Sequence, residues 1–191
     1  MRAHWLTAIG TSLLILMAPQ ARADDVTDQV NEGLAAYAKK DYATAIAALE
    51  ASIALLRQAR SEIWKTYLPP APLGWKAEDI EAGAGMLGMG SSASRKYGRG
   101  GESVEVSLMT DQPILQGLAS IVSNAMIGAA AGRIVVIGGR RMNYIREDNS
   151  FVTTLADRVL VRVQGSSGVT EETLRQFLAL IPLTEIEKAA R

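Results

Sequence analysis

Apolar residues recur at helical spacing over the first third of the chain. The first stripe has a small or apolar residue at every fourth position: Val26, Val30, Leu34 and Ala38. The second stripe follows at spacings of three, four and seven: Tyr42, Ala45, Ile46, Leu49, Ile53, Leu56 and Ile63. The polar residues 39–41 separate the stripes, and Asp41 is placed to cap a second helix. Because so short a turn forces two helices back against each other, we expect an antiparallel helical hairpin over residues 24–68.

Three prolines at positions 69, 70 and 72 end the helical pattern. Proline cannot continue a helix and holds the backbone extended, so we expect a strap and a glycine-rich loop over residues 69–91. Trp75 is expected to anchor this strap to the following core. Residues 83–88 match G-x-G-x-x-G, but no buried strand precedes them and no apolar helix follows. We therefore interpret them as a loop and not as a dinucleotide site.

Alternation of period two dominates residues 92–191 and predicts an antiparallel α+β domain. Strands are expected over residues 93–97, 104–109, 133–137, 140–146, 150–156 and 158–164. In the last strand valines face a core, while Arg158, Leu160 and Arg162 face water. Helices are expected over residues 111–127 and after Thr170, with a short final helix capped by Thr184. The overall expectation is a helical hairpin followed by an antiparallel sheet covered by helices.

Several residues of the expected hairpin are spaced as in a known type of helical repeat. Gly33, Tyr42 and Ala45 have the spacing of a tetratricopeptide repeat, and residues 26–60 resemble a single such unit. In that family a small residue in the first helix lets the second approach, which implies this role for Gly33. Ser52 departs from the family pattern, as does the absence of a closing proline near Arg57. Since repeat arrays need about three units and no second copy is present, the hairpin must pack on the rest of the chain or on another protein.

The remaining part of the chain loosely resembles a PsbP-like sandwich. The resemblance is one of element order alone, and it implies an antiparallel sheet covered by helices. It transfers no site residue, because a shared fold does not carry a function.

Residues 1–23 have the three parts of an export signal in order. Arg2 provides a positive start, residues 5–17 are apolar, and Ala21 and Ala23 are the small residues that a signal peptidase reads. We expect cleavage after Ala23 and a periplasmic location. An uncleaved anchor is less favoured, since a membrane-spanning helix needs about 20 apolar residues.

Composition limits which side chains are available for catalysis and metal binding. The chain has no cysteine, and its one histidine, His4, lies in the expected leader. A mature chain without imidazole or thiol lacks the usual general base, thiol nucleophile and transition-metal ligands. No G-x-S-x-G or serine-lysine motif is present. We therefore expect a protein that is not an enzyme, with no catalytic residue, no cofactor and no metal site.

The net charge and its distribution limit the kinds of partner that the chain is expected to bind. Twenty acidic residues balance twenty basic ones, which gives no support to nucleic-acid binding. Arginines in the sheet region either complement the acidic first third of the chain or form a basic surface for an anionic partner. Residues 112–132 carry no charge and include a G-x-x-x-G spacing, but their polar residues favour a buried helix over a membrane span. Peripheral contact with a membrane is accordingly less favoured.

These observations predict an exported accessory or adaptor protein. Its hairpin and sheet surface would be presented to another protein of the cell envelope, or the hairpin would associate with itself. The residues expected to bind the partner are Tyr37, Tyr42, Trp75, Arg158 and Arg162. The alternative is a periplasmic carrier or sensor that holds an apolar or anionic ligand between the 111–127 helix and the sheet.

Overall fold

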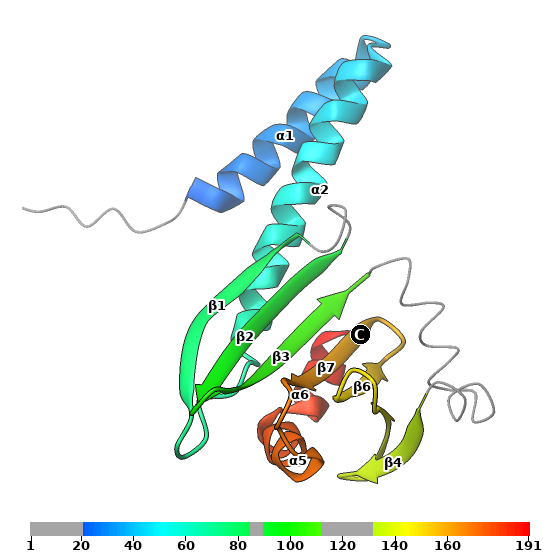
Figure 1. Cartoon of the computed structure of the whole chain (residues 1–191). Helices are drawn as coiled ribbons and strands as arrows, with labels where there is room; N and C mark the ends of the chain where they lie inside the picture. Colours follow the sequence, from blue (N-terminus) through cyan, green and yellow to red (C-terminus); the bar gives the residue numbers. More distant parts are fainter. Residues whose placement is uncertain (1–20, 85–89, 112–131) are drawn as a thin grey trace, which may run out of the picture.

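The structure is a computed structural model that describes residues 21–84, 90–111 and 132–191. A hairpin of two helices leads into a single sheet, and two further helices complete the described part (Figure 1). The helices are α1 (Ala21–Ala38), α2 (Tyr42–Lys65), α5 (Glu171–Leu180) and α6 (Leu183–Ala189). The strands are β1 (Lys76–Ala84), β2 (Ser91–Arg99), β3 (Glu102–Thr110), β4 (Arg133–Ile137), β5 (Arg140–Ile145), β6 (Ser150–Leu155) and β7 (Val159–Gly165). This is the α+β architecture expected from the sequence.

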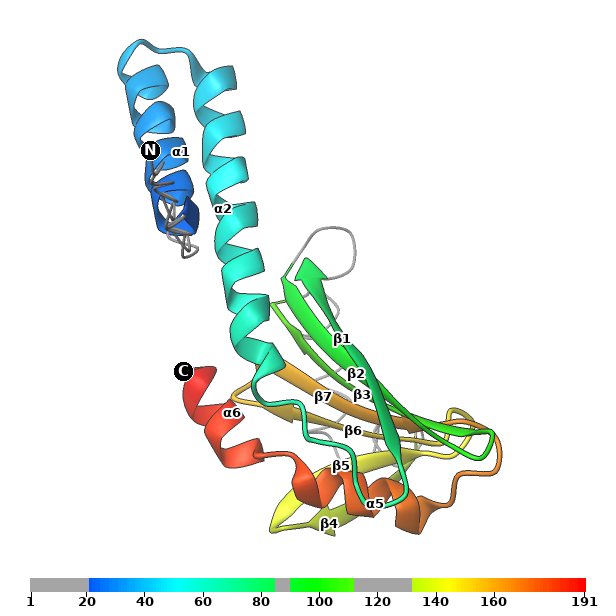
Figure 2. The same cartoon turned by 90° about the vertical axis from the view of Figure 1, so that its left-hand side faces the viewer.

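The α1–α2 hairpin projects from the sheet like a rod (Figures 1 and 2). Lys40 reverses the chain with φ +62°, and the Asp41 side chain accepts a hydrogen bond of 3.2 Å from the Thr44 N–H. The predicted cap is therefore confirmed. A Cβ on Gly33 would lie 3.0 Å from the Leu49 Cγ, so the two helices approach closely at this glycine. The buried residues in the first half of α2 are all small: Ala45, Ala48 and Ser52.

Seven strands within the described residues form one sheet in the order β1-β2-β3-β7-β6-β5-β4, and every neighbouring pair is antiparallel. Strand β1 corrects the expectation of loop structure throughout residues 69–91. Glu78, Asp79 and Glu81 are exposed in this strand, and its pairing with β2 is irregular between Ala77 and Ile80. An edge strand needs no apolar alternation, and charges and bulges protect it from pairing with other chains. The polar sequence of β1, which did not indicate a strand, is thus typical of a sheet edge.

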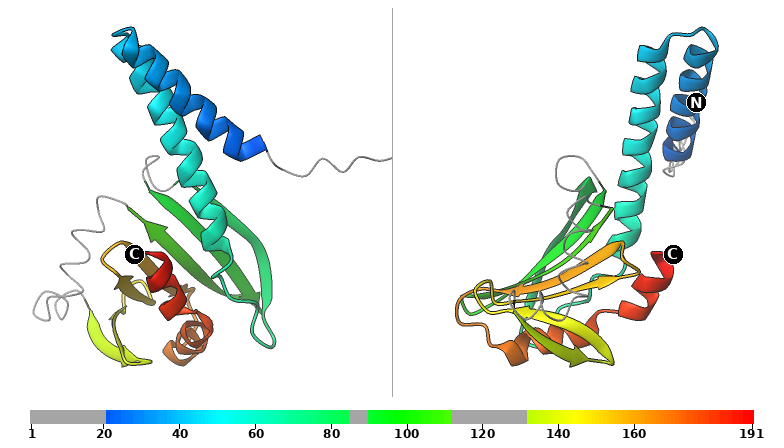
Figure 3. Two further views of the ribbon diagram at one scale, coloured as in Figure 1. Left: turned by 180° about the vertical axis from the view of Figure 1, so that it is seen from behind. Right: turned by 90° about the vertical axis from the view of Figure 1, so that its right-hand side faces the viewer.

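One face of the sheet carries the core. Alternate residues of β3 and β7 are fully buried on it: Val104, Val106, Leu108, Val159, Val161 and Val163. Helices α5 and α6 lie together on one side of the sheet (Figure 3), and their Leu174, Phe177 and Ile186 belong to the same core. The last turns of α2 join this core through Trp64.

The proline strap is fixed to the core by two aromatic residues. The Tyr97 hydroxyl donates a hydrogen bond of 2.7 Å to the Pro69 carbonyl, and burial raises the pKa of Tyr97 to about 12. Trp75 meets Phe177 edge-on at 5.1 Å between ring centroids. The expectation that Trp75 anchors the strap is confirmed.

The other face of the sheet is less polar than predicted. Leu160, expected to face water, is 5% exposed and forms a small buried cluster with Val152, against which Met109 and Ile145 pack. The pairing of Met109 and Leu160 across β3 and β7 brings these apolar side chains together. The helix expected over residues 111–127 lies almost wholly outside the described residues.

The last helix begins earlier than predicted. Pro182, and not Thr184, occupies the cap position of α6, which starts at Leu183. Proline suits the start of a helix because no intrahelical acceptor exists there for the N–H that it lacks.

Replacing Gly90 by alanine is expected to lower the free energy of unfolding by more than about 2 kcal/mol. Gly90 has φ +71°, and a Cβ there would overlap the carbonyl oxygen of Thr110. Gly98→Ala is the matched control, since that glycine of β2 has no atom within 4 Å of the added Cβ. Urea denaturation of both variants measures the difference; equal stability of the two would contradict the described contact.

Acid should weaken the attachment of α5 to the sheet. Hydrogen bonds from Arg175 and Arg133 hold the pKa of Glu171 below its ordinary value of 4.5. A lowered pKa stabilises the fold fully above the unfolded value, and this stabilisation is lost as the pH falls through the folded value. We expect Glu171→Gln to cost about 0.5–1 kcal/mol at neutral pH and nothing near about pH 2.

The control is Glu172→Gln, which removes a charge from the same first turn of α5. Denaturation curves recorded from neutral to acid pH compare the two variants. A pH-independent cost for Glu171→Gln would show that the ion pairs are not its cause.

Candidate functional site

The most unusual surface in the described structure is apolar and lies on the hairpin. It consists of seven large side chains with exposed fractions between 41% and 64%: Leu34, Tyr37, Tyr42, Ile46, Leu49, Ile53 and Leu56. We call this surface the hairpin face. Ile63 continues its line toward the sheet and is also exposed.

The hairpin face follows from how apolar residues are divided by size on α2. Small residues at positions 45, 48 and 52 turn toward α1 and are buried. The large residues sit on an adjacent line of the helix, at alternating spacings of four and three. Gly33 lets α1 approach α2 closely, and the Leu49 side chain packs against it. The large side chains of this line on α2 nevertheless keep between 41% and 58% of their surface exposed.

Tyr37 and Tyr42 lie together at the turn of the hairpin. Their ring centroids are 6.1 Å apart with the ring planes tilted by 57°, and both side chains are exposed. The turn is the end of the hairpin that points away from the sheet (Figure 1). These two predicted residues therefore belong to the hairpin face.

The other predicted residues lie elsewhere. Trp75 is 7% exposed, packs on Phe177 and carries the Arg99 guanidinium 4.4 Å above its ring. It offers little surface to a partner. The structure does not bring Trp75 near the tyrosines of the hairpin turn.

Arg162 extends from β7 on the face of the sheet away from the main core, and Arg158 lies in the turn just before β7. Arg158 pairs with Asp111 at 3.3 Å, and Arg162 pairs with Asp148 at 3.3 Å. Arg158 is more than half exposed, whereas Arg162 is mostly covered. They form a second candidate surface, separate from the hairpin face.

A polar cluster that the sequence analysis missed fixes the hairpin to the sheet. Arg60 of α2 donates a hydrogen bond of 2.9 Å to the Ser91 hydroxyl and forms an ion pair with Asp111. Ser91 in turn shares a hydrogen bond of 2.9 Å with Thr110. The sequence did contain a signal for this cluster, because Arg60 is the one charged residue in the line of large apolar residues on α2 and therefore calls for a polar partner.

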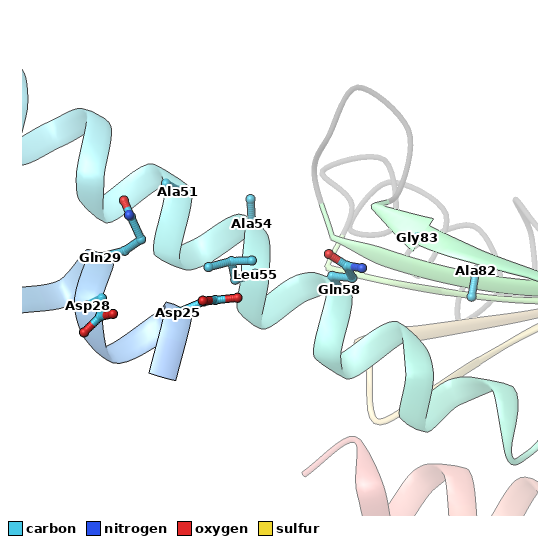
Figure 4. A pocket seen from close by; sticks show the side chains of 9 residues that line it. All are labelled: Asp25, Asp28, Gln29, Ala51, Ala54, Leu55, Gln58, Ala82 and Gly83. Carbon is cyan, nitrogen blue, oxygen red and sulfur yellow. The ribbon is translucent and has the colours of Figure 1, made fainter. Parts of the chain in front are cut away.

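A groove of about 710 Å³ lies on the other side of α2 (Figure 4). Asp25 and Asp28 of α1, Gln58 of α2 and Ala82 of β1 are among the residues that line it. Among the described lining residues, the polar side chains are these two carboxylates and the amides of Gln29 and Gln58. The alternative ligand site was predicted between the 111–127 helix and the sheet. That helix lies almost wholly outside the described residues, so the site stays a prediction.

The titratable groups with clear pKa shifts have structural explanations. The pKa values of Glu171 and Glu187 are lowered by arginine partners, and that of Asp41 is lowered by its cap to Thr44. Among the described residues, no group of three or more histidine, cysteine or acidic side chains is placed to hold a metal ion.

Comparison with known proteins gives no further evidence about the role of the hairpin face. No protein-family model, curated protein or solved structure matches the chain. None of the helices in the described ranges combines the length and apolarity needed to cross a bilayer.

Asp111→Asn is expected to weaken the attachment of the hairpin to the sheet. Asp111 has φ +47°, a conformation that asparagine tolerates, so the variant removes the charge without adding backbone strain. Because its ion pairs with Arg60 and Arg158 are partly exposed, we expect a loss of about 1 kcal/mol in dilute salt and a smaller loss in 1 M salt.

The measurement is urea denaturation at the two salt concentrations. Asp157→Asn is the matched control, because Asp157 also has a positive φ, +53°, and is exposed. A loss for Asp111→Asn that does not respond to salt would contradict an electrostatic origin.

Proposed function

We propose that this protein is an exported, non-catalytic accessory or adaptor protein that binds a protein partner through the hairpin face. The observation that carries the proposal is the exposure of seven large apolar side chains on one side of a hairpin. The export signal expected over residues 1–23 directs the proposal to the cell envelope.

The size of the hairpin face favours a binding role. From their exposed fractions, the seven side chains present on the order of 700 Å² to solvent, more than the roughly 300–600 Å² of the largest patch on a typical monomer. Leaving such an area in water is unfavourable at about 25 cal/mol per Å². A partner that covers the face recovers this free energy.

The chemistry of the face favours a protein over a membrane or a nucleic acid. From residue 30 to residue 56 the bases are Lys39 and Lys40, both at the turn, and three acids accompany them. Amphipathic helices that bind membranes carry lysines and arginines along the polar side, and nucleic acids require several phosphate contacts. A protein surface of matching apolar character requires neither.

The sheet supplies the second surface of the proposed adaptor. Arg162 stands on the side of β7 opposite to its buried valines, and Arg158 precedes this strand in the turn. Their ion pairs with Asp111 and Asp148 are partly exposed, so an anionic group of a partner can compete for them.

Photo-crosslinking in the natural host tests the proposal. A benzophenone amino acid replaces Tyr42, a conservative change at an exposed aromatic position. Irradiation is expected to give a discrete covalent adduct, whose protein component is identified by mass spectrometry. Adding Ile53→Glu should reduce the adduct at least tenfold, because a charge buried at an apolar contact loses its hydration.

The control is Ala47→Glu, which places the same charge at an exposed position on the other side of α2. This variant should keep the adduct. Absence of any adduct, or an equal loss in both variants, would reject binding through the hairpin face.

A further inference from the structure

The line of large residues on α2 has the spacing of a coiled coil. Positions 42, 46, 49, 53, 56, 60 and 63 alternate steps of four and three, which is an average of 3.5 residues. A repeat of 3.5 residues keeps one seam of a helix facing a second helix. The spacing therefore specifies a helix as the element that covers the hairpin face.

The residue types along the seam fit a contact between two α2 helices. Ile46 and Ile53 occupy one set of core positions, while Leu49 and Leu56 occupy the other. In parallel coiled coils, a β-branched residue alternating with leucine in this way favours two strands.

The seam is free of the sheet over its first part. Arg60 is the first seam residue that turns to the sheet, where it contacts Ser91 and Asp111. From Tyr42 to Leu56 the seam spans about 21 Å, at about 1.5 Å per residue. This part of the rod extends beyond the sheet in both views (Figures 1 and 2), so a second molecule can reach it.

We propose that a second copy of this chain covers the hairpin face, with α2 of each copy packed along the seam from Tyr42 to Leu56. This rests on the proposed function, because it names the partner of the same surface. Two hairpins joined in this way form a four-helix arrangement with the sheets outside it.

Area and charge support a second copy as the occupant. Each copy would contribute on the order of 700 Å², close to the roughly 800 Å² per partner of a stable interface. In a two-fold dimer the same patch meets itself, so like charges within it would repel. All seven residues of the hairpin face are uncharged, which meets this requirement.

The oligomeric state of the protein purified from its host tests the proposal. Light scattering after size exclusion, at about 10 μM protein, is expected to give twice the mass of one chain, because a dimer with a micromolar or tighter dissociation constant is mostly paired at this concentration. The mass should stay doubled in 1 M salt, since apolar contacts are not screened. Ile53→Glu should give the mass of one chain, and Ala47→Glu should keep the doubled mass.

A labelling experiment decides the question if Ile53→Glu does not fold. The chain has no cysteine, so Ile46→Cys and Ala47→Cys each introduce a single thiol. Ile46 is 58% exposed in the single chain and Ala47 is also exposed, so a monomer labels similarly at both positions. A dimer is expected to slow maleimide labelling at position 46 at least tenfold relative to position 47, and dilution should remove the difference.

The outcomes separate this proposal from the preceding one. The mass of one chain at every concentration overturns the dimer. A photo-crosslinked adduct to a different protein would then leave the adaptor role standing. A dimer that Ile53→Glu does not dissociate also overturns the proposal, because its interface would lie on another surface.

Discussion

The close approach of α1 to α2 at Gly33 is the constraint on which the shape of the hairpin depends. The Leu49 side chain packs into the space that this glycine leaves, because a Cβ there would lie 3.0 Å from the Leu49 Cγ. The residues of the first half of α2 that are fully buried are alanine and serine. The largest apolar side chains of the hairpin thus keep much of their surface exposed on one side.

The other described elements of the chain leave the hairpin face exposed. The sheet buries its own valines under α5, α6 and the last turns of α2. Arg60 of α2, beyond the end of the hairpin face, fixes the hairpin to the sheet through Ser91 and Asp111. The sheet therefore acts as a base from which the hairpin projects (Figure 2).

Sequence periodicity predicted most of the elements, for identifiable physical reasons. The hairpin, the Asp41 cap and the strands from β2 to β7 carry strong local signals, either a repeat of helical period or an alternation of period two. Strand β1 was missed because an edge strand with Glu78, Asp79 and Glu81 shows no apolar alternation. Leu160 was misplaced because a single strand does not reveal that Met109 and Val152 lie beside it.

The candidate site could be predicted only in part. Tyr37 and Tyr42 were predicted as partner-binding residues of the hairpin, and the structure leaves both side chains exposed. Periodicity shows which residues share a side of a helix, but not whether another element covers that side. Exposure of the full line from Tyr42 to Leu56 therefore required the structure, as did the role of Arg60. The tetratricopeptide resemblance stays a prediction.

Amide hydrogen exchange measured across a dilution series tests most directly whether the hairpin needs a partner. We expect exchange in residues 42–56 to slow as the protein concentration rises, because association stabilises the helix that it covers. Exchange in β3 and β7, whose alternate side chains are buried within one chain, should not change with concentration. Exchange in residues 42–56 that is as slow as in β7 and insensitive to dilution would show that the hairpin is stable without a partner.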